Sequence, residues 1–84
     1  MDFADWVRSA VAAIPKGSTR SYKYIARAAG SPRAYRAVGN ILNKNRDPNV
    51  PCHRVIKSDG SLGGYYYGSR AKARKLKEEG YVSR

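Results

Sequence analysis

Two breaks that contain glycine and proline divide the first half of this chain into short segments. The first break is Ile14-Pro15-Lys16-Gly17, and the second is Gly30-Ser31-Pro32. Glycine adopts the left-handed conformation that ends many helices, and proline cannot continue a helix but fits the first turn of the next one. The chain is therefore predicted to begin with three short helices, which restricts it to a small, mainly helical domain.

The first two predicted helices have recognisable start and stop residues. Apolar residues recur at helical spacing between Phe3 and Ile14, with Asp2 as a possible N-cap. Ser21 is predicted to cap a second helix over residues 22–29, which Gly30 then ends.

The third predicted helix begins with Ser31 as its cap and Pro32 as its first residue, and it runs to residue 42 or 43. Together with the second helix it resembles a helix-turn-helix. Its small residues allow close approach to DNA, and Arg33 and Arg36 lie on its leading turns. The same composition also fits a packed helix with solvated arginines, so this segment alone does not decide between the two.

The second half of the chain is predicted to hold a loop, a short β-hairpin and a last helix. Residues 43–51 are rich in Asn, Asp and Pro, which is typical of a loop. Residues 55–62 predict a strand, an Asp-Gly turn and a return strand. Residues 70–79 form a densely basic helix that Gly80 ends. The predicted fold is mainly α and winged-helix-like, with one domain over residues 1–84.

Charge and composition narrow the class of function. The chain has 17 Lys and Arg against 6 Asp and Glu, a net charge of +11, which attracts phosphate backbones. A surface charged for solubility is the alternative, but nucleic acid is favoured. Neither a signal peptide nor a membrane-spanning run is predicted. One cysteine and no Cys/His cluster with zinc spacing indicate a reduced, cytoplasmic protein without a metal.

The single cysteine, Cys52, stands between Pro51 and His53. A thiol attacks as its thiolate, and a neighbouring imidazole with a cation nearby is a setting that lowers a thiol pKa. A lone cysteine is more often an inert small apolar residue. Its neighbours nevertheless make Cys52 a candidate nucleophile.

The motif around this cysteine resembles the active-site signature of the O6-alkylguanine-DNA alkyltransferases. The signature residues are Pro51-Cys52-His53-Arg54-Val55, followed by Ser58-Asp59-Gly60-Ser61-Leu62-Gly63-Gly64-Tyr65. The resemblance covers nearly the whole chain, because further matches occur in order: Phe3, Val7, Ile14-Pro15-x-Gly17, Ser21-Tyr22, Arg36-Ala37-Val38-Gly39, Asn45 and Leu76-x-x-Glu79-Gly80. It implies direct DNA repair without a cofactor, in which one protein molecule irreversibly takes one alkyl group.

The resemblance also implies catalytic roles. Cys52 would accept the alkyl group, His53 would take the thiol proton through a water, and Glu79 would orient His53. Glu78 is a rival for that last role because it is adjacent. Tyr22 would press on a phosphate to favour base rotation and donate toward a guanine ring nitrogen.

The same resemblance implies how DNA is held. The third helix would dock in the minor groove, and Arg36 would enter the base stack as the flipped nucleotide leaves it. Other residues implied at the DNA surface are Ser21, Tyr22, Arg33, Ala37 and Gly39. Asn45 would be a hinge to the active-site loop, and the base pocket would involve Pro51, Val55, Tyr65 and Tyr66.

The chain departs from the family pattern in three ways. The loop between Arg36 and Cys52 is about a residue shorter, with Asn49-Val50 before the Pro-Cys. Tyr66 and Tyr67 stand where many members have small residues, which narrows the predicted pocket to small alkyl groups. The N-terminal domain usual in the family has no counterpart in this sequence, so two forms are expected: a minimal protein, or a domain of a longer protein such as one fused to another repair enzyme.

The expected partner is double-stranded DNA carrying O6-alkylguanine, with the protein acting as a monomer in the cytoplasm or nucleoid and at no membrane. Two other functions stay open. One is a non-enzymatic sensor that resembles the alkyltransferase-like proteins and binds the lesion without repairing it, although those proteins usually replace the cysteine. The other is a plain helix-turn-helix DNA binder.

Overall fold

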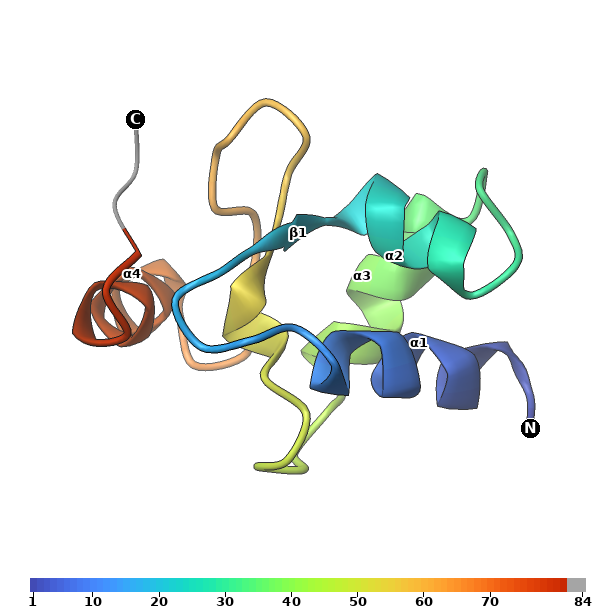
Figure 1. Cartoon of the computed structure of the whole chain (residues 1–84), viewed down its shortest axis with the longest axis horizontal. Coiled ribbons are helices and arrows are strands. Elements are labelled where there is room, and N and C mark those ends of the chain that lie inside the picture. The colour runs from blue at the N-terminus through green and yellow to red at the C-terminus, as the bar shows by residue number, and fades with distance from the viewer. Residues whose placement is uncertain (82–84) are drawn as a thin grey trace.

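The computed structural model of the protein describes residues 1–81, and in this part of the chain helices predominate. Helices α1 (Phe3–Ala12), α2 (Tyr22–Ala28) and α3 (Tyr35–Asn43) pack together, α4 (Ser69–Glu78) lies at the opposite end of the molecule, and strand β1 (Arg20–Ser21) runs between them (Figure 1). The mainly α fold expected from the sequence is confirmed. The elements in order are α1 (Phe3–Ala12), β1 (Arg20–Ser21), α2 (Tyr22–Ala28), α3 (Tyr35–Asn43), the 3-10 helix η1 (Cys52–Arg54), β2 (Val55–Ile56) and α4 (Ser69–Glu78).

The first two helices begin where the sequence predicts. Asp2 caps α1 through a capping box, in which its carboxylate accepts from the Asp5 amide at 2.9 Å and the Asp5 carboxylate accepts from the Asp2 amide at 3.1 Å. Ser21 caps α2, and its hydroxyl oxygen accepts from the Tyr24 amide at 3.0 Å. Both caps satisfy amides that have no partner within the helix.

Helix α3 begins three residues later than the predicted start at Pro32. The Ser31 amide donates to the Ala26 carbonyl of α2 at 2.9 Å, and the Ala34 amide donates to the Ser31 carbonyl at 2.9 Å. Ser31 therefore completes the end of α2 and opens a tight turn, so it is not the cap of α3. Helix α3 starts at Tyr35 without a side-chain cap. Arg33 consequently lies in the turn, not on the helix.

The core lies beneath the helix-turn-helix formed by α2 and α3. Its fully buried members include Val7 and Val11 from α1, Ile25 from α2, Val38 from α3 and Val55 from β2. Burial of these side chains accounts for most of the favourable free energy that holds the three helices together. None of the helices described within residues 1–81 has the length and apolar character needed to cross a bilayer.

The predicted β-hairpin over residues 55–62 is not formed. The Asp-Gly turn is present, because the Lys57 amide donates to the Ser61 carbonyl at 2.9 Å, but β2 pairs in parallel with β1. Arg20 is the register partner of Val55. The return segment makes other bonds, since the carbonyls of Leu62 and Gly64 accept from a lysine side chain of α4. The parallel pairing connects the cysteine segment directly to the start of α2.

Candidate active site

Cys52 is the first residue of η1 and is 8% exposed. Its Sγ accepts a hydrogen bond of 2.8 Å from Nδ2 of Asn45. The same Nδ2 donates to the Val50 carbonyl at 3.2 Å. Asn45 lies two residues after the end of α3, so it connects this helix to the loop that carries the thiol.

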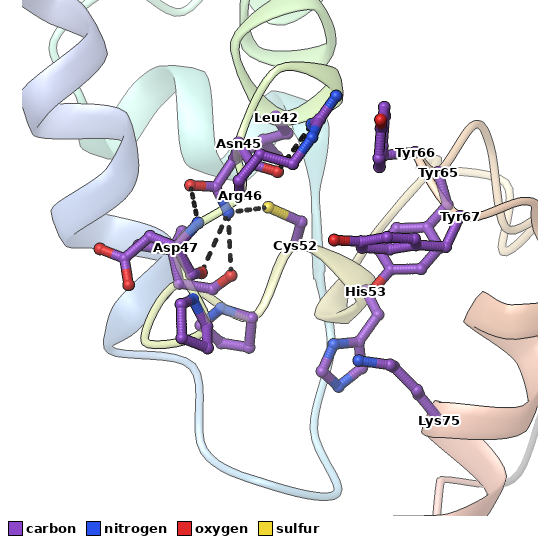
Figure 2. Close-up of a pocket in the computed structure, with 13 residues that line it drawn as sticks. Leu42, Asn45, Arg46, Asp47, Cys52, His53, Tyr65, Tyr66, Tyr67 and Lys75 are labelled. Carbon is purple, nitrogen blue, oxygen red and sulfur yellow. Dashed lines mark hydrogen bonds between the residues drawn. The ribbon is translucent and has the colours of Figure 1, made fainter.

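A cavity of about 350 Å³ opens beside Cys52. The end of α3 and the following loop form one wall, and the segment after β2 forms the opposite wall (Figure 2). Of the expected site residues, the cavity gathers Cys52, His53, Asn45, Pro51, Tyr65 and Tyr66. Val55, which was also expected at the base pocket, is fully buried in the core and does not line this cavity.

Burial raises the pKa of the Cys52 thiol above its ordinary value. The hydrogen bond from Asn45 and the positive charges of Lys72 and Arg46 oppose this effect and lower the pKa. A backbone hydrogen bond at Cys52 also lowers the pKa. The sequence predicts a lowering role for His53, but the side chains that lower the pKa are those of Asn45, Lys72 and Arg46. Because the net direction is upward, the free thiol is mostly protonated at neutral pH and needs a base to become nucleophilic.

His53 lies on the other side of η1, against the partly buried carboxylate of Glu79. Its Nε2 is 2.9 Å from Oε1 of Glu79, although the N–H is not aligned for a hydrogen bond. Burial lowers the pKa of His53, and Glu79 opposes the shift without reversing it. The imidazole is therefore neutral at pH 7 and able to accept a proton.

Arg54 fixes the carboxylate of Glu79. Its Nε donates to Oε1 at 2.9 Å and its Nη2 to Oε2 at 2.6 Å, while Nη1 donates to the Ile14 carbonyl at 2.8 Å. The hydrogen bonds from Arg54 are the main cause that lowers the pKa of Glu79 to about 2, and the adjacent His53 acts in the same direction. Glu79 is thus ionised and oriented at neutral pH, whereas its rival Glu78 is exposed.

The thiol and the imidazole do not point at one another. The sulfur of Cys52 turns toward Asn45, whereas the ring of His53 extends toward Lys75 (Figure 2). A proton passing from Sγ to the ring therefore needs a bridging molecule such as water.

Tyr22, at the start of α2, faces a lysine that sequence reasoning did not single out. Lys72 of α4 is fully buried, and its ammonium donates to the Tyr22 hydroxyl at 3.3 Å, to the Gly64 carbonyl at 3.2 Å and to the Leu62 carbonyl. The Tyr22 hydroxyl itself donates to the Gly64 carbonyl at 3.3 Å. Desolvation lowers the pKa of Lys72 to about 8, and it raises the pKa of Tyr22.

One sequence signal for Lys72 was present. It lies four residues before Leu76, which is the apolar anchor of α4, so both side chains share the inward face of this helix. In so basic a helix this spacing does not by itself distinguish Lys72 from the other lysines. The three acceptors of its ammonium explain how this charge is buried.

The expected DNA-binding residues gather around a second cavity of about 590 Å³. Tyr22, Arg36 and Gly39 line it, together with Gly63 and Gly64. Leu42 and Tyr65 line the cysteine cavity, while their neighbours Asn43 and Gly64 line this one, so the two cavities adjoin. The other residues expected at DNA lie nearby: Arg33 is exposed in the turn, Ala37 is half-buried on α3, and the Ser21 hydroxyl caps α2.

The fold and the site together define a class of protein, a small helix-turn-helix domain with a buried cysteine beside a histidine and an oriented carboxylate. Residues 2–81 match the family described as "6-O-methylguanine DNA methyltransferase, DNA binding domain". The chain belongs to this family.

Individual relatives carry names of the same family. The chain is 53% identical over 81 residues to the methylated-DNA–protein-cysteine methyltransferase of Methanosarcina barkeri, covering 93% of this chain and 50% of that protein. The crystal structure of Mycobacterium tuberculosis OGT in complex with DNA superposes with a TM-score of 0.88 and 45% identity, over 94% of this chain and 49% of that one. The chain thus spans about half the length of these relatives.

A further structural relative is Atl1 of S. pombe, solved in complex with damaged DNA containing O6-carboxymethylguanine. It has a TM-score of 0.84 and 36% identity, covering 93% of this chain and 75% of that one.

Proposed function

We propose that this chain repairs DNA directly, by moving the alkyl group of O6-alkylguanine irreversibly to Cys52. The observation that carries the proposal is the placement of a hydrogen-bonded thiol and His53 in one cavity, with Glu79 held against His53 and the helix-turn-helix residues lining a second, adjoining cavity. The chain would act as a monomer on duplex DNA in the cytoplasm or nucleoid.

Delivery of the base requires flipping, because O6 lies inside the stacked duplex. Arg36 is exposed on α3 at the mouth of the second cavity. A planar guanidinium there enters the stack and donates hydrogen bonds to the orphaned partner base. Tyr22 lines the same cavity, where its hydroxyl meets the incoming guanine.

The transfer is a single displacement. The Cys52 proton passes through a water to His53, which is neutral before the transfer. The carboxylate of Glu79 stabilises the positive charge that His53 then carries. The thiolate forms the S–C bond as the C–O6 bond breaks, and the electron pair of that bond goes to the guanine. The guanine regains a proton at a ring nitrogen, with Tyr22 as donor and solvent restoring the Tyr22 proton. Because a thioether is a poor leaving group, each molecule acts once.

The test is the intact mass of the protein after incubation with a duplex that carries O6-methylguanine. The wild-type chain should gain one methyl mass and Cys52→Ala should gain none. Absence of any mass change in the wild-type chain contradicts the proposal.

The similarity to Atl1 favours one other candidate, a lesion-binding protein without transfer activity. This candidate predicts tighter binding to the O6-methylguanine duplex than to the undamaged duplex, with no mass gain. A plain DNA binder would show equal affinity for both. The presence of Cys52 at the cavity favours transfer.

A further inference from the structure

Arg46 crosses the opening of the cysteine cavity from one wall to the other. Its Nη1 donates to the carbonyls of Asn43 and Asn45, both at 3.0 Å, which anchors the guanidinium to the end of α3. Its Cζ lies 2.9 Å from the ring centroid of Tyr66 on the opposite wall. Arg46 therefore joins two loops that are separate in the sequence (Figure 2).

Three tyrosines, Tyr65, Tyr66 and Tyr67, line one wall of the cysteine cavity, and their rings form a row from Tyr66 to His53. The rings of Tyr66 and Tyr67 meet edge to face with centroids 4.8 Å apart, and those of Tyr67 and Tyr65 with centroids 5.6 Å apart. Tyr65 in turn lies edge-on to His53 at 6.5 Å. This row of rings supports Tyr66 from behind, although Tyr66 itself is 52% exposed.

We propose that Arg46 and Tyr66 form a bridge that restricts the O6 substituent to methyl-sized groups. The inference rests on the proposed alkyl transfer. In that displacement the sulfur and O6 lie on opposite sides of the carbon under attack. A methyl group directs only hydrogens sideways from this line, whereas a benzyl group directs a ring into the walls of the cavity.

The bridge also removes a surface that would otherwise favour an aromatic substituent. The guanidinium covers the face of Tyr66, so this face cannot stack on the ring of a benzyl group. A bulky substrate has to separate Arg46 from Tyr66 or break the two hydrogen bonds that anchor Arg46. Loss of an exposed cation–π contact alone corresponds to roughly a two- to fivefold change in rate.

The experiment compares single-turnover transfer from two duplexes of the same sequence, one with O6-methylguanine and one with O6-benzylguanine. Intact mass reports each transfer, and the result is the ratio of the methyl rate to the benzyl rate. In both reactions the S–C bond forms and the C–O6 bond breaks as above. The ratio is informative because a loss of positive charge near the thiol slows both reactions alike.

Arg46→Ala and Tyr66→Ser should each lower the methyl-to-benzyl ratio by about tenfold, within the range that pocket sterics produce. Tyr66→Phe keeps the ring and should keep the wild-type ratio. Arg74→Ala removes the same charge from an exposed position on α4 and should also leave the ratio unchanged. Circular dichroism of each variant shows that it is folded, and Tyr66→Ser tests the bridge independently if Arg46→Ala does not fold.

The outcomes separate this inference from the proposed function. Methyl transfer by the wild-type chain with an unchanged ratio in Arg46→Ala and Tyr66→Ser overturns the bridge alone. Equal methyl and benzyl rates in the wild-type chain also overturn the bridge alone. Absence of methyl transfer by the wild-type chain overturns the proposed function and the bridge with it.

Discussion

At the scale of single residues, Lys72 is a buried cation whose charge acts on the thiol of Cys52. Its charge lowers the pKa of Cys52, so Lys72→Met should raise this pKa and slow alkylation of the thiol at neutral pH. The difference from wild type should be largest below about pH 8, because the pKa of Lys72 is about 8. The measurement is the rate of reaction with iodoacetamide as a function of pH.

Lys77→Met is the matched control, because Lys77 is exposed on the same helix. It should leave the thiol titration unchanged. An identical titration curve in wild type and Lys72→Met would show that Lys72 does not act on Cys52.

Glu79 predicts a loss of stability in acid. Its pKa is about 2 in the folded chain against 4.5 as the ordinary value, so the folded state favours the ionised carboxylate. This stabilisation is fully present above the ordinary pKa and is lost as pH falls from about 5 to about 2. The side chain is 13% exposed, and the shift corresponds to at most about 3 kcal/mol at neutral pH.

Denaturant unfolding of wild type and Glu79→Gln at several pH values measures this contribution. Glu79→Gln should be less stable at neutral pH, and the two free energies of unfolding should converge as the pH falls toward about 2. A constant difference over this range would mean that the ion pair with Arg54 is not its source.

At the scale of elements, the segment that follows β2 is placed against α2 by Gly63. Gly63 has a φ of +73°, and an added Cβ would lie 3.0 Å from the Tyr22 hydroxyl. Gly63→Ala should therefore displace Tyr22 and slow methyl transfer from duplex DNA by about tenfold or more, in addition to a backbone cost of about 1–2 kcal/mol. Single-turnover transfer and thermal unfolding measure the two effects.

Gly60→Ala is the control for the backbone term. Gly60 has a φ of +91°, and an added Cβ there would have no neighbour within 4 Å. It should lose stability to a similar extent and keep its transfer rate. If both variants transfer equally fast, Tyr22 is not placed by this contact.

The elements also show which parts of the structure local sequence could predict. The caps at Asp2 and Ser21 were predicted correctly because each bonds an amide three residues away. The start of α3 was wrong because the Ser31 amide bonds back to the preceding helix. The hairpin was wrong because β2 finds its partner in β1, and that choice depends on the whole core.

The candidate site also has parts that local sequence predicts and parts that depend on distant contacts. Cys52, His53 and their neighbours were recognisable as a contiguous motif, and the distant Glu79 through the family resemblance. The burial of Lys72 and the bridge from Arg46 to Tyr66 depend on contacts across 8 to 50 residues of chain, which composition and spacing do not encode.

At the scale of the whole molecule, the net charge of +11 predicts a strong dependence of DNA affinity on salt. Each phosphate that a lysine or arginine contacts releases a counterion and makes the slope of log K against log salt more negative by about 0.9. Binding to undamaged duplex should therefore weaken by at least about tenfold between about 50 and 200 mM salt. Fluorescence anisotropy over a salt series measures the slope, and a flat response would contradict an electrostatic interface.

The same titration distinguishes a residue that enters the base stack from one that contacts a phosphate. Arg36→Ala should weaken binding to the lesion duplex and slow transfer from it, while transfer from the free alkylated base changes little, because only the duplex requires flipping. A phosphate contact would instead reduce the salt slope by about 1, whereas a side chain inserted between bases leaves the slope nearly unchanged. Arg74→Ala on α4 removes an equal charge away from the second cavity and controls for the loss of net charge. A smaller salt slope in Arg36→Ala would place Arg36 at the phosphate backbone instead of in the base stack. Equal losses of transfer from the duplex and from the free base would show that Arg36 has no particular role in flipping.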